Sequence, residues 1–368
     1  MQRKRNISLA LSSKLTPMSE LVRSTLRPSR PDQHDTVAVE LAIQDLSWLA
    51  ASDHALQEAG APVVPLVDRL AIQSLVANTL DELFTVRFGL LQVSTARPGD
   101  NGHAAAAPLA TLLDEIRARA RATVHLLYET WRRHIEPLLV CSCSIALLPP
   151  AQLSRQQRAE LGERFAREVW PVLTPIAVDQ GHPFPNLRNR GLNLAVALNR
   201  EDHRVARRSK VFVVVAIPSG LDRLVKVGLA DTGEASFILL EELIAMQVGR
   251  MFPGFRLTSC SPFRVTRACA PTTWRDAADE RIKSIPENPC SFARDRVVRL
   301  ELAKGSPTHV ETFLGISLGL DPADIYRVDG PLDLHGLCDR CSRDRRGALA
   351  TLPPPRTSSM ADSFPRIQ

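Results

Sequence analysis

Two close pairs of cysteines are the first residues whose type and spacing could support chemistry. Cys338 and Cys341 lie three residues apart, and Cys141 and Cys143 lie two apart. A structural zinc site needs four ligands, and the first pair has only His335 nearby in the sequence. A thioredoxin-like redox motif would need a βαβ context that this stretch lacks. We therefore interpret both pairs as chance spacing and predict neither a metal site nor a redox site.

Serines and histidines could supply a nucleophile and a general base. Residues 315–319 match the letters of the G-x-S-x-G elbow, with Ser317 as the nucleophile. That elbow needs a strand before it and a helix after it, whereas we expect these residues in the last turn of a helix. His182, in the segment 181–185 (GHPFP), could act as a general base, but a histidine in a turn is the simpler interpretation. Both common glycine-rich phosphate-binding motifs are missing from the sequence. The residues alone therefore predict no catalytic residue.

Arginines offer a third kind of chemistry, the binding of phosphate groups. Arg264, Arg267 and Arg299 lie on or near a predicted sheet. They could form a phosphate-binding face, although solvated arginines or structural ion pairs are the more common arrangement. A predicted helix carries five more arginines that could bind a polyanion: Arg117, Arg119, Arg121, Arg132 and Arg133. The net charge of +6 over 368 residues does not predict a nucleic-acid partner.

The elements that would position these residues begin with a series of helices. Apolar residues at helical spacing predict one helix around 46–56 and a second from Leu66. Thr79 followed three residues later by Glu82 matches a capping box, so we expect a new helix to begin at Thr79. A long amphipathic helix is expected over about 109–138.

After Gly191 the apolar pattern changes to a period of two. This alternation predicts strands over 192–198, 211–217 and 298–302. Three more helices are expected: one that begins at a Ser154–Gln157 capping box, one over 239–252, and one with Thr308 and Glu311 at its start and Gly319 at its end. Strands interleaved with helices predict an α+β fold with a mixed sheet.

These patterns divide the chain into four parts. We expect a basic, unstructured extension over 1–40, an all-helical N-terminal domain over 41–105, an α+β head domain over 106–337, and an unstructured tail over 338–368. No apolar run approaches the about 20 residues that cross a bilayer. Seven cysteines, an odd number, favour a reducing compartment. We expect a cytoplasmic protein, with peripheral association at the inner membrane as an alternative.

A series of short motifs resembles the polyphosphate kinase family, specifically its N-terminal and head domains. The motifs occur in the family's order between about Asp45 and Leu337: Asp45–Leu49, Leu56–Ala59, Pro65–Leu70, Leu80–Phe84, Pro171–Pro175, Gly181–Pro185, Leu192–Leu194, Phe263–Arg267, Val298–Glu301 and Tyr326–Leu332. The stretch 268–296 fits the family poorly.

The resemblance implies an enzyme that transfers the γ-phosphate of ATP reversibly to inorganic polyphosphate through a phosphohistidine, with Mg²⁺ as the metal. In the family, the N-terminal domain helps to bind the nucleotide, the head domain contributes to a homodimer, and chemistry lies in two further domains. None of the nine histidines here is followed two residues later by lysine, so the family's phospho-accepting motif is missing. The resemblance therefore predicts a truncated form that is inactive alone and lacks the Mg²⁺ site. The alternatives are a dimerisation or docking module for an intact polyphosphate kinase, and a polyanion-binding module.

The resemblance also points to one nucleotide contact. The family's ATP-binding asparagine directly precedes Leu-Asp-Glu, a position held here by Thr79, with Asn78 as the neighbouring asparagine that could substitute for it. Thr79 lacks the amide that can donate and accept at once. Asp81 and Glu82, expected in the first turn of a helix, would repel a phosphate, so we expect the contact to be with the base or the sugar.

Overall fold

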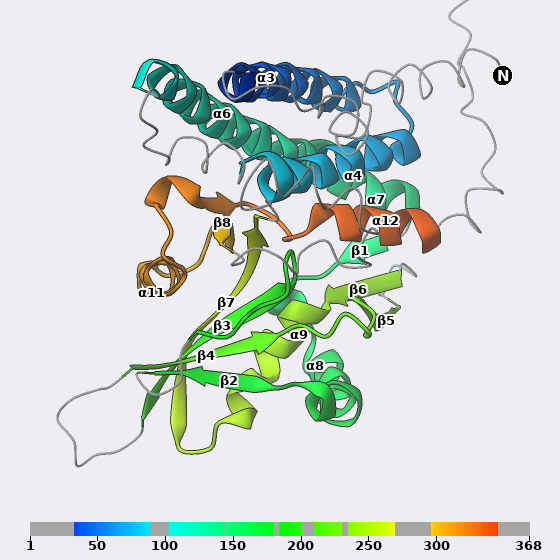
Figure 1. The fold of residues 1–368 in the computed structure, drawn as a ribbon. Coiled ribbons are helices and arrows are strands. Elements are labelled where there is room, and N and C mark those ends of the chain that lie inside the picture. Colours follow the sequence, from blue (N-terminus) through cyan, green and yellow to red (C-terminus); the bar gives the residue numbers. More distant parts are fainter. Residues whose placement is uncertain are drawn as a thin grey trace, which may run out of the picture.

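A layer of helices lies on one side of the computed structural model and two β-sheets lie on the other (Figure 1). The structure describes residues 33–88, 103–143, 145–179, 184–200, 210–229, 235–268 and 296–344. The helical layer contains α3 (Gln33–Ala59), α4 (Leu66–Glu82) followed by the π-helical turn Leu83–Phe88, α6 (His103–Thr130) followed by the π-helical turn Trp131–Ile135, and α7 (Glu136–Cys143). Apolar side chains at helical spacing, among them Leu49, Leu56 and Leu70, are fully buried between these helices.

The larger sheet has six strands in the order β2-β4-β3-β7-β8-β9. Its neighbours pair antiparallel except for β8 and β9, which pair in parallel, so the sheet is mixed. Its strands are β2 (Pro175–Val178), β3 (Leu192–Arg200), β4 (Lys210–Ala216), β7 (Phe255–Arg267), β8 (Val297–Ala303) and β9 (Ile325–Val328). A smaller sheet has the order β1-β6-β5, from β1 (Ile145–Leu147), β5 (Leu224–Leu229) and β6 (Ala235–Leu239).

Alternation along the central strands gives the larger sheet two buried faces. On β3, Leu194 and Val196 belong to one apolar cluster, with residues of α8 (Arg155–Arg164) and α9 (Leu240–Gln247). Ala195 points to the opposite face and joins a second cluster, with residues of α11 (Thr308–Leu318). Helices on both faces therefore account for the nearly continuous apolar composition of β3 and β4.

Helix α12 (Leu334–Asp344) packs beneath α4, between the helical layer and the sheets (Figure 1). Leu334, Leu337, Cys338 and Cys341 recur at i, i+3, i+4 and i+7, and all four are buried. The expectation of an unstructured tail from residue 338 is therefore wrong for the first turns of that segment.

The α+β fold and its mixed sheet are as the sequence predicts. The capping box is present at Ser154, whose hydroxyl accepts from the Gln157 amide while the Gln157 side chain accepts from the Ser154 amide. Gly319 ends α11 in the left-handed conformation, with φ of 62°. Among the described residues, no helix is both long enough and apolar enough to cross a membrane.

Two expected helix boundaries and one expected helix cap differ from the structure. The first helix begins at Gln33 rather than near residue 46. α4 runs without a break through Thr79, so Thr79 is no N-cap; its hydroxyl donates to the carbonyl of Leu75 one turn earlier. The residue at the N-cap of α11 is Pro307, and no side chain caps that helix. Helix α6 packs along α3 and so lies on the helical side of the molecule. The helical part of the chain therefore continues past residue 105, where we expected the helical N-terminal domain to end.

Candidate functional site

The two predicted nucleotide-binding residues lie in the C-terminal half of α4 but have different surroundings. Thr79 is buried, with an exposed fraction of 4%, and its hydroxyl is already bonded within the helix. Asn78 is half-buried, and its amide nitrogen donates to the Glu82 carboxylate at 3.1 Å. Of the two side chains, only that of Asn78 is open to an approaching ligand.

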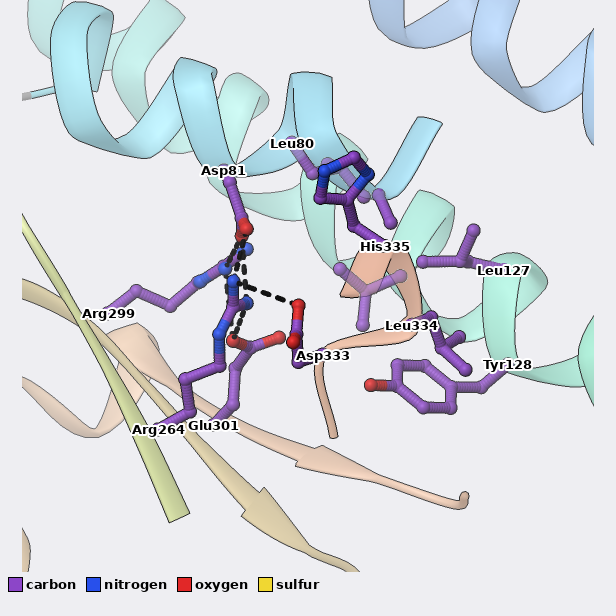
Figure 2. Close-up of a pocket in the computed structure, with 12 residues that line it drawn as sticks. Leu80, Asp81, Leu127, Tyr128, Arg264, Arg299, Glu301, Asp333, Leu334 and His335 are labelled. Carbon is purple, nitrogen blue, oxygen red and sulfur yellow. Dashed lines mark hydrogen bonds and ion pairs between the residues drawn. The ribbon is translucent and has the colours of Figure 1, made fainter. Parts of the chain in front are cut away.

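Three residues beyond Asn78, Asp81 enters a group of charges that we call the buried ion cluster, in which all members are buried except the half-buried Asp333. Its members are Asp81, Arg264, Arg299, Glu301 and Asp333 (Figure 2). Arg264 binds both oxygens of Asp81, and its Nη1 also donates to Glu301 at 2.8 Å. Arg299 donates to Asp81 as well, and to the same oxygen of Glu301 at 3.0 Å. The cluster thus joins the end of α4 to the larger sheet.

Strand register explains why the charged residues meet. Arg264 pairs with Glu301 and Thr266 pairs with Arg299 across β7 and β8, so these side chains share one face of the sheet. The residues between them, including Val265 and Leu300, point to the opposite face and contact α11. One face of this strand pair is therefore apolar, and the other presents charges to the helical layer.

The electrostatic environment keeps Asp81 ionised. Burial alone would raise the pKa of Asp81, but the charges of Arg264 and Arg299 lower it to about 2. Burial alone would lower the pKa of Arg264, but the surrounding carboxylates raise the pKa of its guanidinium well above the usual value. Arg299 also donates to Thr266 at 3.2 Å and stacks over the Phe84 ring at 4.6 Å.

The buried ion cluster does not form a phosphate site. Three carboxylates face the two arginines, so no positive charge is left over for an anion, and the adjoining cavity, at about 20 Å³, has room for about one water molecule. The third arginine of the predicted basic face, Arg267, donates to the Leu187 carbonyl at 3.1 Å at the end of the strand. The sheet arginines are thus structural ion pairs and backbone contacts, the second of the two interpretations of the sequence.

The arginines of α6 and of the π-helical turn that follows it are also engaged within the chain. Arg117 pairs with Asp324, Arg119 with Asp53, Arg132 with Asp329 and Arg133 with Glu129, while Arg121 donates to the carbonyls of Ala323 and Ile325. Every one of these guanidiniums therefore has an acceptor within the chain.

The remaining candidates from the sequence are not brought together. Ser317 lies in the last turn of α11, as expected for a chance match to the elbow motif. His182 lies outside the described residues. Cys338 is buried on α12, where burial raises the pKa of its thiol, and the nearby His335 contacts the Ser74 hydroxyl at 2.8 Å. No group of three or more metal-binding side chains occurs among the described residues.

The role of Asp81 escaped the sequence interpretation, although two signals pointed to it. Position 81 falls on the same helical face as the buried Ala77 and Phe84, where a carboxylate needs a partner. Arg264 lies between Phe263 and Val265, and Arg299 lies between Val298 and Leu300, so each has apolar neighbours on both sides. The sequence thus contained the carboxylate and its two arginines, but it did not show that they lie together in the fold.

Comparison with known proteins agrees with this architecture. A model of the polyphosphate kinase N-terminal domain matches residues 42–143, and a model of the polyphosphate kinase middle domain matches residues 156–339. The chain is 34% identical over 295 residues to the polyphosphate kinase of Bacillus cereus, which covers 79% of this chain and 42% of that protein. It is 31% identical over 296 residues to the polyphosphate kinase of Neisseria gonorrhoeae, with 79% and 42% covered.

A solved structure of similar fold is the polyphosphate kinase of Porphyromonas gingivalis. It superposes with a TM-score of 0.63 at 21% identity, over 88% of this chain and 42% of that one. The chain thus spans less than half the length of these relatives. Both matched domains follow each other in the family's order, and the chain belongs to the polyphosphate kinase family.

Proposed function

We propose that this chain takes part in the reversible transfer of the ATP γ-phosphate to inorganic polyphosphate, as the N-terminal and middle domains of a polyphosphate kinase. The observation that carries the proposal is the match of both domain models, in order, over residues 42–143 and 156–339. The relatives named polyphosphate kinase support ATP and polyphosphate as the substrates.

Within this reaction, we assign nucleotide binding to the C-terminal half of α4. The half-buried amide of Asn78 is the group that offers a donor and an acceptor there, since the Thr79 hydroxyl is used inside the helix. Asp81 and Glu82 lie in the last turn of α4, not in the first turn of a new helix. The Glu82 charge beside Asn78 still disfavours a phosphate there, so the contact is with the base or the ribose.

The phosphoryl group is not taken up by these residues in our proposal. No histidine in the sequence has a lysine two residues later, the pattern that the resemblance associates with the phosphohistidine. The buried ion cluster does not fit a Mg²⁺ ion either, because the carboxylates of Asp81 and Glu301 are bound to arginines. Magnesium therefore has no step in this account.

Titration of the purified chain with a fluorescent ATP analogue tests the assignment. We expect saturable binding, and an Asn78→Ala variant that binds about tenfold more weakly because one amide contact is lost. Thr79→Val is the matched control, since it removes only a hydroxyl that faces Leu75, and it should bind as the wild type does. Binding that is absent in the wild type, or unaffected in Asn78→Ala, would contradict the assignment.

A further inference from the structure

Arg264 is the point at which four segments of the chain meet. Besides Asp81 on α4 and Glu301 on β8, its guanidinium approaches the Asp333 carboxylate at 3.6 Å, and its Nε donates to the carbonyl of Arg190 at 3.0 Å. Asp333 directly precedes α12, and Arg190 directly precedes the segment that leads into β3. A single buried side chain thus holds the end of α4 against the sheet, α12 and the entry to β3.

Two of these four partners have strained backbones. Within the described residues, Arg190 (φ 59°) and Asp333 (φ 51°) are the non-glycine residues with left-handed backbone conformations. Such conformations cost free energy in residues with a Cβ and persist only where the surroundings enforce them. Here both are held by contacts to Arg264, so the strain is concentrated around the buried ion cluster.

A cluster of this kind is better suited to fixing a geometry than to adding stability. Burying charges costs solvation energy, and packed apolar residues in their place are often equally stable. In return, directional bonds specify a single arrangement. Both oxygens of Asp81 are held by guanidiniums from the sheet, so α4 cannot rotate or slide without breaking charged bonds. Asn78 lies one helical turn away on the same helix and is fixed along with Asp81.

We propose that Asp81 is a positioning residue for nucleotide binding, and that the buried ion cluster holds α4 so that Asn78 faces the nucleotide. This inference rests on the proposed function. Asp81 itself touches no ligand, since it is 3% exposed and saturated by arginines. Loosening the cluster should weaken nucleotide binding even though Asn78 is unchanged.

The test compares Asp81→Asn with two controls in the whole chain. Asp81→Asn keeps the size of the side chain and removes its charge. Asp68→Asn makes the same change at an exposed position in the first turn of α4. Leu56→Ala, in the core of α3, lowers stability without touching the cluster. Arg299→Lys is a milder change that keeps the charge but cannot bridge Asp81, Glu301 and Thr266 together, and it serves if Asp81→Asn does not fold.

Two measurements are made on each folded variant. In Asp81→Asn we expect hydrogen exchange of the amides in 74–82 to be about tenfold faster, and the affinity for the fluorescent ATP analogue to fall about tenfold. Asp68→Asn should match the wild type in both. Leu56→Ala should bind the ATP analogue as the wild type does, because it lowers stability without loosening the cluster. If the cluster acted only through stability, Leu56→Ala would also bind weakly.

The outcomes separate this inference from the proposed function. If the wild type binds no ATP analogue, the proposed function fails, while exchange in 74–82 still decides whether Asp81 fixes α4. If Asn78→Ala weakens binding but Asp81→Asn does not, the inference is overturned. It is also overturned if Leu56→Ala loses as much affinity as Asp81→Asn, or if exchange in 74–82 stays at the wild-type rate in Asp81→Asn.

Discussion

Asp45 and Asp81 are both buried aspartates beside arginine, yet their environments drive them in opposite directions. Asp45, on α3, has Oδ1 3.7 Å from Nε of Arg87, and within the described residues its Oδ2 has no hydrogen-bond partner. Burial raises the pKa of Asp45 to about 7, and the charge of Arg87 opposes this only in part. The guanidiniums of Arg264 and Arg299 instead lower the pKa of Asp81 to about 2. The geometry of the charged bonds, more than burial, decides the protonation state.

Asp45 should make stability depend on pH. Its pKa in the folded chain lies above the value of about 3.9 in an unfolded chain, so between these values the native state holds a proton that the unfolded state has lost. Stability from this group is therefore present at low pH and is lost as pH rises toward 7. We expect Asp45→Asn to remove on the order of 2 kcal/mol of the decline in unfolding free energy between pH 5.5 and 7.5.

Urea unfolding at three pH values measures this difference. Glu40→Gln, at an exposed position on the same helix, is the control and should keep the wild-type slope. An identical pH slope in the wild type and Asp45→Asn would show that Asp45 is ionised throughout this range.

At the scale of elements, periodicity identified the central strands β3, β4 and β8 and most helices, but it missed short strands such as β1 and β2 and did not show where some helices begin or end. The Thr79–Glu82 spacing fits a capping box, yet no residue breaks α4 before it, so the hydroxyl bonds one turn back instead. The expected start of the tail at residue 338 falls inside α12, because the residues after Cys341 are rich in serine and arginine and show no apolar period. In both places the local sequence was compatible with either a continuous helix or a break. Packing against the rest of the chain favours the continuous helix.

Helix α12 should contribute strongly to stability. Leu337 is fully buried between α12 and the helical layer. We expect Leu337→Ala to lower the free energy of unfolding by about 2–5 kcal/mol, through lost apolar contact and a residual cavity. Ile316→Ala on α11, where the side chain is 77% exposed, should change it by less than about 0.5 kcal/mol. Chemical unfolding of both variants checks this, and equal effects would mean that α12 is not packed as described.

At the scale of the whole molecule, the order of the motifs was enough to predict the family, and the interleaving of strands and helices was enough to predict the α+β fold. The contacts that join the helical layer to the sheet could not be predicted in the same way. Asp81 is 183 residues from Arg264 and 218 from Arg299, and no local pattern states which distant charges will pair. The same holds for the arginines of α6, whose acceptors include Asp324 and the Ile325 carbonyl.

The chain by itself should not complete the family's reaction. Phosphoryl transfer depends on positioned electrostatic groups around the transferred phosphate, and the arginines of the buried ion cluster are already neutralised by carboxylates. Incubation with ATP, Mg²⁺ and a polyphosphate primer should give no polyphosphate and no acid-labile phosphoprotein. Turnover above a no-protein control, or a phosphohistidine found by mass spectrometry, would refute this expectation.

The two-sided character of β7 and β8 also has a consequence for how the chain folds. A slip of β8 by one residue would exchange its faces, placing Leu300 against Asp81 and the Arg299 guanidinium among the apolar side chains of α11. Arg299 would then have no acceptor and Asp81 would lose a donor, so the shifted pairing carries a large penalty from unpaired buried charge. The charges that hold α4 in place therefore also disfavour this misalignment of the sheet.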